Sequence, residues 1–226
     1  MESSQEGRQP GNPVWSPVIV IGRQFGSRGR RIGRMVAEHL GLDFYDSELL
    51  ATAAEKLGFS RHIFDLHDEK APNPLRSLLQ GAFGLADNFH DVSICSERMY
   101  SEQSKVIRNI SRGKGCVIVG RTADYILRDH PQLISIFIHA PIEHRAQNIL
   151  SRGEAEDLQS AIEIAKKVDK ERENYYNFYT GDSKWGKAEN YSLSLDSSKG
   201  TDENLAELII NFSRIMHKGR NEVCRP

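Results

Sequence analysis

The sequence predicts an α/β fold in which a parallel sheet of five strands is covered by helices on both faces. Two apolar runs rich in β-branched residues, at residues 18–22 and 116–120, are typical of strands buried on both faces. A third such run occupies residues 133–140, and shorter strand patterns occupy residues 42–46 and 191–196. Helical patterns separate these runs, as the crossover connections of a parallel sheet require.

Helices are predicted between and after the strands. The first is the clearest, because Ile32, Met35, Val36 and Leu40 recur at helical spacing and Gly41 follows as a C-cap. The remaining helical patterns lie at residues 47–58, 96–112, 122–129, 143–152, 154–178 and 203–216. This alternation of strand and helix along the chain is what predicts the fold class.

The 226 residues are enough for one folded domain, which we place at residues 17–217. Residues 1–16 are rich in Pro, Gly and Ser and are predicted to form a disordered leader. Residues 68–91 carry Pro and Gly but no clean periodicity, so we expect a partly helical, mobile insertion there. Residues 218–226 are expected to form a flexible tail.

Composition argues against several classes of protein. The net charge of -1 disfavours broad, nonspecific nucleic-acid binding, which usually shows as strong overall basicity. No apolar segment approaches the roughly 20 residues that span a bilayer, and the first residues lack the apolar stretch of a secretory signal. Cys95, Cys116 and Cys224 show no metal-ligand spacing, which suggests a reducing compartment and a buried apolar role for Cys116. We therefore expect a cytoplasmic protein with no membrane or specific nucleic-acid partner.

A glycine-rich turn follows the first strand and leads into the first helix, in the stretch VIVIGRQFGSRGRRIGRMVAEHL (residues 18–40). Free backbone N–H groups and the helix dipole favour an anion at such a place. The turn lacks the lysine of the common phosphate loop G-x-x-x-x-G-K-[ST]. It carries five arginines instead, which are Arg23, Arg28, Arg30, Arg31 and Arg34. Arginine can also clamp phosphate, and in bidentate fashion.

Arg28, Arg30 and Arg31 crowd the start of a helix, where the dipole disfavours each cation by roughly 0.3–1 kcal/mol if nothing offsets it. A bound polyphosphate would reverse the sign of that interaction, so the cluster indicates a phosphate site. The alternative is a solvent-exposed basic turn whose glycines serve only the backbone. Ser27 is the one hydroxyl in the turn that could bind a magnesium ion.

Polar residues also follow two other strands. Arg121 comes directly after residues 116–120, at the carboxyl end of a strand, where ligands bind in open α/β sheets. Asp124 could share its face, or could simply pair with an arginine such as Arg121. Asp46 and Ser47 end the second strand, either as substrate contacts or as a plain helix N-cap.

A charged helical stretch near residues 165–186 interleaves lysines and arginines with tyrosines. Asp169 and Arg172 are three residues apart, so they can pair on one helix face. Arg145 and Arg152 flank the same region. From composition alone a solvated helix is the better interpretation of this stretch.

The chain resembles the cytidylate kinase-like family of P-loop nucleotide kinases over roughly residues 17–212. Six segments in the right order carry the resemblance: IGRQFGSRGRRIG, FYDSELL, VIVGRTADYIL, IFIHAPIEHRAQNI, DKERENYYNFYTGDSKWG and YSLSLDSS. It implies a three-layer P-loop kinase-like domain with a helical lid over about residues 151–183, and it puts residues 68–91 on the acceptor side. The chain departs from true cytidylate kinases in reading GSRGRR where they resemble GSGKGT, and in carrying Thr122 where they place an aspartate.

The resemblance also implies roles for individual residues. ATP phosphates would bind in the turn, at Gly26, Ser27, Arg28, Gly29 and Arg30. The monophosphate acceptor would lie near Asp46, Ser47, Arg121 and Asp124. The lid would contribute Arg145, Arg152, Asp169 and Arg172. Arg30, Arg121 and Arg172 would be the catalytic cations, and Mg²⁺ would use the Ser27 hydroxyl.

The predicted function is transfer of the γ-phosphoryl group of ATP to a nucleoside monophosphate, with a CMP-like acceptor. Such a transfer depends mainly on positioning and charge neutralisation. Two alternatives remain. One is a nucleotide-binding regulatory module with weak or no catalysis, and the other is a non-enzymatic protein that binds polyanions through the basic turn.

Overall fold

The computed structural model describes residues 16–59, 89–181 and 183–223. Its centre is a five-stranded sheet in the order β2-β3-β1-β4-β5, with every strand pair parallel. The strands are β1 Val18–Arg23, β2 Asp43–Tyr45, β3 Cys116–Val119, β4 Leu133–His139 and β5 Leu193–Asp196. The predicted fold class and all five predicted strands are confirmed.

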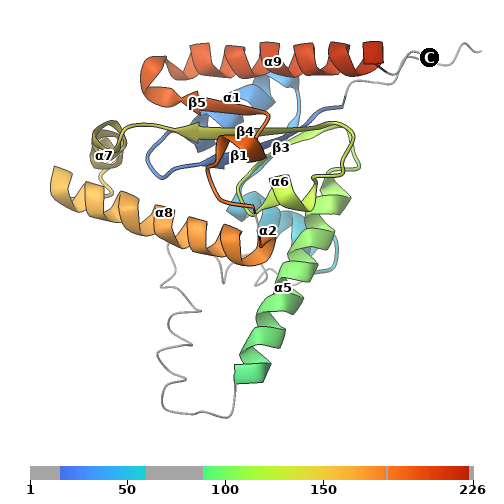
Figure 1. Cartoon of the computed structure of the whole chain (residues 1–226), viewed down its shortest axis with the longest axis horizontal. Coiled ribbons are helices and arrows are strands. Elements are labelled where there is room, and N and C mark those ends of the chain that lie inside the picture. Colours follow the sequence, from blue (N-terminus) through green and yellow to red (C-terminus); the bar gives the residue numbers. More distant parts are fainter. Residues whose placement is uncertain (1–15, 60–88, 182, 224–226) are drawn as a thin grey trace, which may run out of the picture.

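Helices cover both faces of the sheet (Figure 1). They are α1 Gly29–Leu40, α2 Ser47–Lys56, α5 Phe89–Ile110, α6 Ala123–Ile126, α7 Ile142–Ser151, α8 Leu158–Thr180 and α9 Asp202–Val223. In Figure 1, α1 and α9 lie on one side of the sheet, and α2, α5, α6 and α8 lie on the other. Two short 3₁₀ helices, Ala188–Asn190 and Ser197–Lys199, flank β5. The molecule therefore has the three layers that the resemblance implies.

The alternation of side chains along β1 separates two cores. Val18 and Val20 pack in the cluster formed with α2, α5 and α6. Ile19 and Ile21 pack in the other cluster, with α1 and α9. Since strand residues two apart share a face, Arg23 continues the series that points toward α1. Both cores end at the carboxyl edge of the sheet, where the glycine-rich turn begins.

Helices α7 and α8 form a smaller unit beside this edge. Ala146 and Ile149 of α7 pack against Ala161 and Ala165 of α8, and Phe25 of the turn packs on the same cluster. A capping box in which the Asp157 side chain accepts from the Ser160 N–H starts α8. The predicted lid region is thus largely α8, in direct contact with the turn.

Several predicted boundaries differ from the structure. Helix α5 begins at Phe89, earlier than the predicted residue 96. Helix α9 continues to Val223, so much of the predicted tail at 218–226 is helical. Residues 1–15 of the predicted leader, residues 60–88 (which include most of the predicted insertion) and residues 224–226 lie outside the described part of the chain.

Cys116 is buried at the start of β3, as expected, and burial raises the pKa of its thiol to about 12. Among the helices that the structure describes, none combines the length and apolarity needed to cross a bilayer.

Candidate active site

The turn between β1 and α1 has a backbone that only certain residues accept. Gly26 has φ 79°, and a Cβ at this position would lie 2.6 Å from the Arg145 carbonyl oxygen. Arg28 is also left-handed, with φ 63°, and is followed by the helical Gly29. Such left-handed and right-handed pairs turn successive N–H groups toward one side and form an anion-binding nest.

Side chains of α7 and α8 hold the outward-facing backbone groups of this turn. Three carbonyls accept hydrogen bonds: Arg23 O from Arg172 Nη1 (2.9 Å), Phe25 O from Arg145 Nη1 (3.1 Å) and Gly26 O from Asn148 Nδ2 (2.9 Å). In a trans peptide the N–H points away from the preceding C=O. The bond to Phe25 O therefore turns the Gly26 N–H away from α7 and α8.

One carboxylate ties this arrangement together. Asp169 accepts the Phe25 N–H at 2.7 Å and pairs with Arg145 at 2.5 Å. Arg145 and Asp169 are both nearly buried, and Arg145 Nε also donates to the Ala140 carbonyl at 3.0 Å. The predicted pairing of Asp169 with Arg172 is long, at 3.9 Å. Asp169 of α8 and Arg145 of α7 therefore hold the backbone of the turn on the side that faces these two helices.

The inward-facing N–H groups form a set without acceptors. Within the described part of the chain, no acceptor lies in hydrogen-bond range of the N–H groups of Gly26, Arg28, Gly29, Arg30 and Arg31. The first N–H groups of a helix have no partner inside the helix. Five such donors at or just before one helix start are an arrangement that can bind an anion.

Ser27 is fully buried, and its hydroxyl donates to the Gln24 carbonyl at 2.8 Å. Its N–H is directed to the same carbonyl at 3.3 Å. The structure thus places the predicted magnesium ligand inside the turn. A metal contact by Ser27 stays a prediction, and it requires the hydroxyl to rotate or the turn to open.

Arg30 lies at the point where two predicted groups of residues meet. Its Nε and Nη2 atoms contact Asp46 Oδ2 at 2.8 and 2.6 Å. Asp46 also caps α2 by accepting the Leu49 N–H at 3.1 Å, so Asp46 rather than Ser47 is the N-cap. Arg34 adds a longer contact to Asp46, at 3.6 Å. A residue expected on the donor side therefore reaches one expected on the acceptor side.

Arg28 and Arg31 share a second carboxylate. Asp202, the first residue of α9, contacts Arg28 Nη1 at 2.6 Å and Arg31 Nε at 2.8 Å. Arg28 Nη2 also donates to the carbonyls of Ser197 and Gly200. The side chains of Arg30 and Arg31 are 60% and 70% exposed, whereas their partners Asp46 and Asp202 are buried. If either arginine moved to a phosphate, its carboxylate would keep other contacts: Asp46 those with Arg34 and the Leu49 N–H, and Asp202 that with Arg28.

A second unusual turn follows β3. Gly120, Arg121 and Thr122 have successive φ values of 79°, 60° and 51°. Left-handed backbone is strained for a β-branched residue, by about 1–3 kcal/mol. The Thr122 hydroxyl is in hydrogen-bond range of the Arg121 carbonyl (2.6 Å) and of the Tyr100 hydroxyl (3.1 Å). Strain of this kind often marks a functional site, here at the predicted acceptor residue Arg121.

Tyrosines from α5 and α8 line the region beside this turn. Tyr100 and Tyr179 stack with ring centroids 4.0 Å apart, and Tyr175 lies 4.8 Å from Tyr179. Tyr175 donates to Gln103 Oε1 at 2.9 Å. Burial raises the pKa of Tyr175, and the nearby Arg121 charge opposes that shift. One face of the charged helix is thus aromatic and partly buried. The sequence pattern shows tyrosines within residues 165–186 but does not place them in the site, and it does not single out Tyr100.

Asp124 lies beneath the same turn. Its carboxylate accepts the Tyr176 hydroxyl at 2.7 Å, and its side chain is buried. Burial raises the pKa of Asp124, and the hydrogen bond from Tyr176 opposes that shift. The contact joins α6 to α8. A direct contact of Asp124 with the acceptor therefore stays a prediction, and the alternative pairing with an arginine is replaced by this tyrosine.

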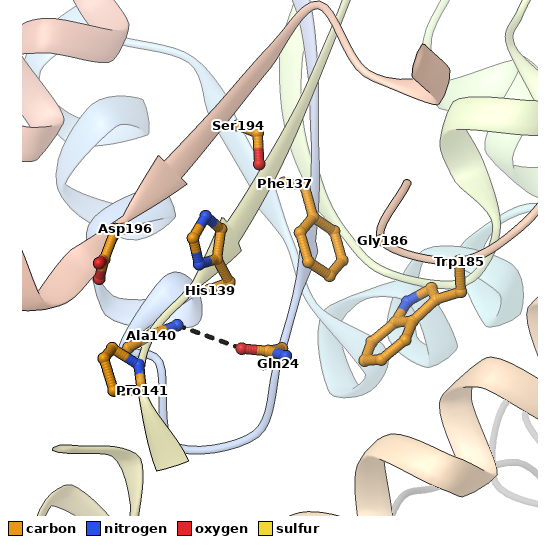
Figure 2. A pocket seen from close by; sticks show the side chains of 9 residues that line it. All are labelled: Gln24, Phe137, His139, Ala140, Pro141, Trp185, Gly186, Ser194 and Asp196. Atoms are coloured by element: carbon orange, nitrogen blue, oxygen red, sulfur yellow. Dashed lines mark hydrogen bonds between the residues drawn. The ribbon is translucent and has the colours of Figure 1, made fainter. Parts of the chain in front are cut away.

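Two hollows lie at the carboxyl ends of β4 and β5, where ligands bind in such sheets. The larger, about 650 Å³, adjoins the nest and is lined by Arg28, Arg31, His144, Asn148 and residues 198–204. The other, about 520 Å³, is shown in Figure 2. There, the Gln24 side chain accepts the Ala140 N–H at 3.1 Å, with Phe137 and Trp185 on one side and His139 and Asp196 on the other.

Several solved structures are similar to this chain. A crystal structure of an uncharacterised protein from Eubacterium ventriosum is similar at 27% identity, with a TM-score of 0.65 over 88% of this chain and 99% of that chain. A gluconokinase from Sinorhizobium meliloti matches at 14% identity and a TM-score of 0.49, over 93% of this chain and 99% of that chain. A shikimate kinase from Acinetobacter baumannii, in complex with shikimate, matches at 15% identity and a TM-score of 0.48, over 88% of this chain and 93% of that chain. The comparison with curated proteins found no match.

The match to a family is more specific. A model of the cytidylate kinase-like family matches residues 18–199, which include the nest, the strained turn after β3 and all of α7 and α8. The chain belongs to the cytidylate kinase-like family.

Proposed function

We propose that this protein transfers the γ-phosphoryl group of ATP to a nucleoside monophosphate, with a CMP-like acceptor. The observation that carries the proposal is the set of N–H groups at the start of α1 that have no acceptor among the described residues, in a member of the cytidylate kinase-like family. These donors are fixed before any ligand arrives. Fixed donors aimed at phosphate oxygens are the main source of catalysis in phosphoryl transfer.

On the donor side, the nest would hold the β- and γ-phosphates through Gly26, Arg28, Gly29 and their neighbours. Arg30 would leave Asp46 and bind a phosphate oxygen. The larger hollow would take the nucleoside part of ATP, because Arg28 and Arg31 belong to both the nest and the hollow. A hollow of about 650 Å³ lies within the range of small-molecule sites.

On the acceptor side, Arg121 would hold the phosphate of the monophosphate, with Ser47 and the α2 N-terminus nearby. The tyrosine cluster would form one wall of this space. Arg172 is the proposed lid cation. Its guanidinium already lies at the turn, 2.9 Å from the Arg23 carbonyl, and together with Arg152 it covers the Phe25 ring.

Magnesium would arrive on the nucleotide. Among the described residues, no three His, Cys, Asp or Glu side chains gather as a metal site. Mg²⁺ in nucleotide kinases is typically held by substrate phosphates and few protein ligands, so the residues present are compatible with it. The ion would neutralise charge on the phosphate oxygens. Ser27 is the proposed protein ligand, subject to the movement described above.

The first experiment measures ADP production from Mg-ATP with CMP, dCMP, UMP, AMP and GMP offered separately. Turnover with one acceptor supports the proposal. Arg30→Ala should lower kcat/KM about 10²-fold, because it removes a cation from the transferred phosphate. Arg214→Ala, an exposed position on α9, is the matched control and should behave like the wild type.

Arg121→Ala separates the two halves of the site. The acceptor KM should rise about tenfold or more, because a hydrogen bond to a charged group contributes about 1.5–3 kcal/mol. The affinity for ATP, measured by calorimetry, should stay within about threefold of the wild type, well inside the ~1.4 kcal/mol that a tenfold change requires. Loss of ATP binding instead would remove Arg121 from the acceptor side.

A second candidate function is a nucleotide-binding module without catalysis. The observation that favours it is that Arg28, Arg30 and Arg31 form ion pairs with Asp46 and Asp202, so their charges are already engaged by carboxylates. ATP binding without ADP production, across the whole acceptor panel, would support this candidate over the kinase.

A further inference from the structure

We propose that Arg23 supplies the cation that bridges donor and acceptor phosphates, in the place of the lysine that the turn lacks. The inference rests on the proposed phosphotransfer function and assigns to it a catalytic residue outside the predicted set. It depends on where the side chain of Arg23 lies relative to two glycines.

The position of Arg23 in β1 determines the direction of its side chain. Arg23 is the last residue of the strand and lies on the same face as Ile19 and Ile21. That face is covered by α1, whose first residue is Gly29. Arg172 holds the backbone of Arg23 through its carbonyl oxygen. The side chain therefore leaves the strand beneath the start of the helix, on a fixed backbone.

Gly29 leaves room for the stem of Arg23. A Cβ on Gly29 would lie 2.7 Å from Arg23 Cβ and 3.2 Å from Arg23 Cγ, which is too close for any side chain. In the common phosphate loop the lysine lies at the start of the helix. Here the first helical residue has no side chain, and the aliphatic part of Arg23 occupies the corresponding space.

Gly120 leaves room for the guanidinium. A Cβ on Gly120 would clash with Arg23 Nη1 and would lie 3.1 Å from Cζ. Gly120 begins the strained turn that carries Arg121, and its N–H donates to the Ile21 carbonyl at 3.0 Å. The side chain of Arg23 thus extends from the nest at one end to the acceptor turn at the other.

This path differs from that of the predicted arginines. Arg28 and Arg31 turn toward Asp202, and Arg30 turns toward Asp46. Arg28 and Arg31 extend toward the β5 side of the sheet, away from the line between the nest and Arg121, whereas Arg30 reaches the acceptor side but ends on Asp46. Arg23 lies along that line, and its planar fork of N–H donors can contact two phosphate groups at once.

The chemical role follows from this placement. As the bond from the γ-phosphorus to the ADP oxygen breaks, a bond forms from that phosphorus to an oxygen of the acceptor phosphate. Arg23 keeps all its protons and donates hydrogen bonds to the oxygens of the transferred group. Its charge offsets the repulsion between the two anions, which is strongest as they approach.

The test compares Arg23→Met, which keeps much of the stem but removes the charge, with Arg23→Lys, which keeps a charge without the planar fork. Arg214→Met is the control for loss of an arginine. Thermal unfolding followed by circular dichroism establishes that each variant is folded. Calorimetry then measures the affinities for Mg-ADP and for a non-hydrolysable Mg-ATP analogue, and the acceptor panel measures kcat.

We expect Arg23→Met to bind Mg-ADP within about threefold of the wild type, well under the tenfold that 1.4 kcal/mol represents. Its preference for the ATP analogue over ADP should disappear, and kcat should fall about 10²-fold or more. Arg23→Lys should retain part of the preference for the ATP analogue and part of kcat.

Wild-type affinities and kcat in Arg23→Met would overturn the assignment of Arg23 alone. An equal loss of ADP and ATP-analogue binding would also overturn it, because Arg23 would then support the nest and not bridge phosphates. If the wild-type protein bound neither nucleotide, the proposed function would fail, and this assignment with it.

Discussion

The two turns of the site are built on opposite principles. The donor turn, residues 24–28, keeps its shape through side chains that reach it from α7 and α8. The acceptor turn, residues 120–122, is left-handed at three successive residues and is held by backbone hydrogen bonds of Gly120 and by the hydroxyl of Thr122. The first turn is held by side chains of two helices, and the second mainly by backbone contacts that maintain a strained conformation.

The glycines show the same difference. A Cβ on Gly26 would meet the backbone carbonyl of Arg145, which cannot move without shifting α7. A Cβ on Gly120 would meet the far end of the Arg23 side chain, which can rotate away. Damage to the donor turn should therefore spread through the fold. Damage to the acceptor turn should cost less stability and should act mainly on function.

The largest effect is expected from breaking the support of the donor turn. Arg145→Ala leaves the nearly buried Asp169 with only its long 3.9 Å contact to Arg172 as an ion pair, and it leaves two carbonyls without donors. Loss of one member of a buried pair typically costs about 3–5 kcal/mol of unfolding free energy. Urea denaturation measures this loss of unfolding free energy, and the affinity for ATP should fall in the same variant.

Lys170→Ala is the matched control on the same helix as Asp169. Its pair with Glu173 is solvent-exposed, so its removal should change the free energy of unfolding by less than about 1 kcal/mol. Equal effects of Arg145→Ala and Lys170→Ala would contradict the view that side chains of α7 and α8 hold the donor turn.

A smaller loss of stability is expected from Gly120→Ala in the acceptor turn. Left-handed backbone costs an alanine about 1–2 kcal/mol, which urea denaturation detects. Gly41→Ala provides the comparison, because Gly41 has φ 64° and no atom within 4 Å of its Cβ position. Both variants should lose similar stability, but only Gly120→Ala should lose turnover, since only it displaces Arg23. Full activity in Gly120→Ala would argue that the guanidinium position is unimportant.

The smallest effect is a pH dependence centred on Asp124. Burial raises the pKa of this carboxyl above its ordinary 3.8, so the folded state holds the proton more tightly than the unfolded state. Stability should therefore fall as the pH rises from about 3.8 through the raised pKa. Asp124→Asn removes the titrating group, and its Tm should vary less over this range than the wild-type Tm. A wild-type Tm that rises more steeply with pH than that of the variant would contradict this sign.

Much of the fold followed from patterns along the chain. The apolar runs at 18–22 and 116–120 could be recognised as buried strands because burial on both faces leaves no alternation. The position of the glycine-rich turn also followed, since a turn between a buried strand and an amphipathic helix lies at the carboxyl edge of the sheet.

The contacts of the charged residues could not be predicted from these patterns. The sequence pattern does not distinguish between the five arginines near the start of α1. It does not predict that Arg30 contacts Asp46 or that Arg28 and Arg31 contact Asp202. Strand alternation could have singled out Arg23, because it is two residues beyond Ile21. That signal needed the knowledge that α1 covers this face.

The sequence by itself determined the strands, the helices and the place of the turn, because the spacing of apolar residues along the chain reflects local structure and burial. Only the tertiary structure decided that α7 and α8 hold the carbonyls of the turn, that its N–H groups remain without acceptors in the described part of the chain, and that Arg23 spans two glycines. These contacts join residues far apart along the chain, and their geometry exists only once the layers have packed.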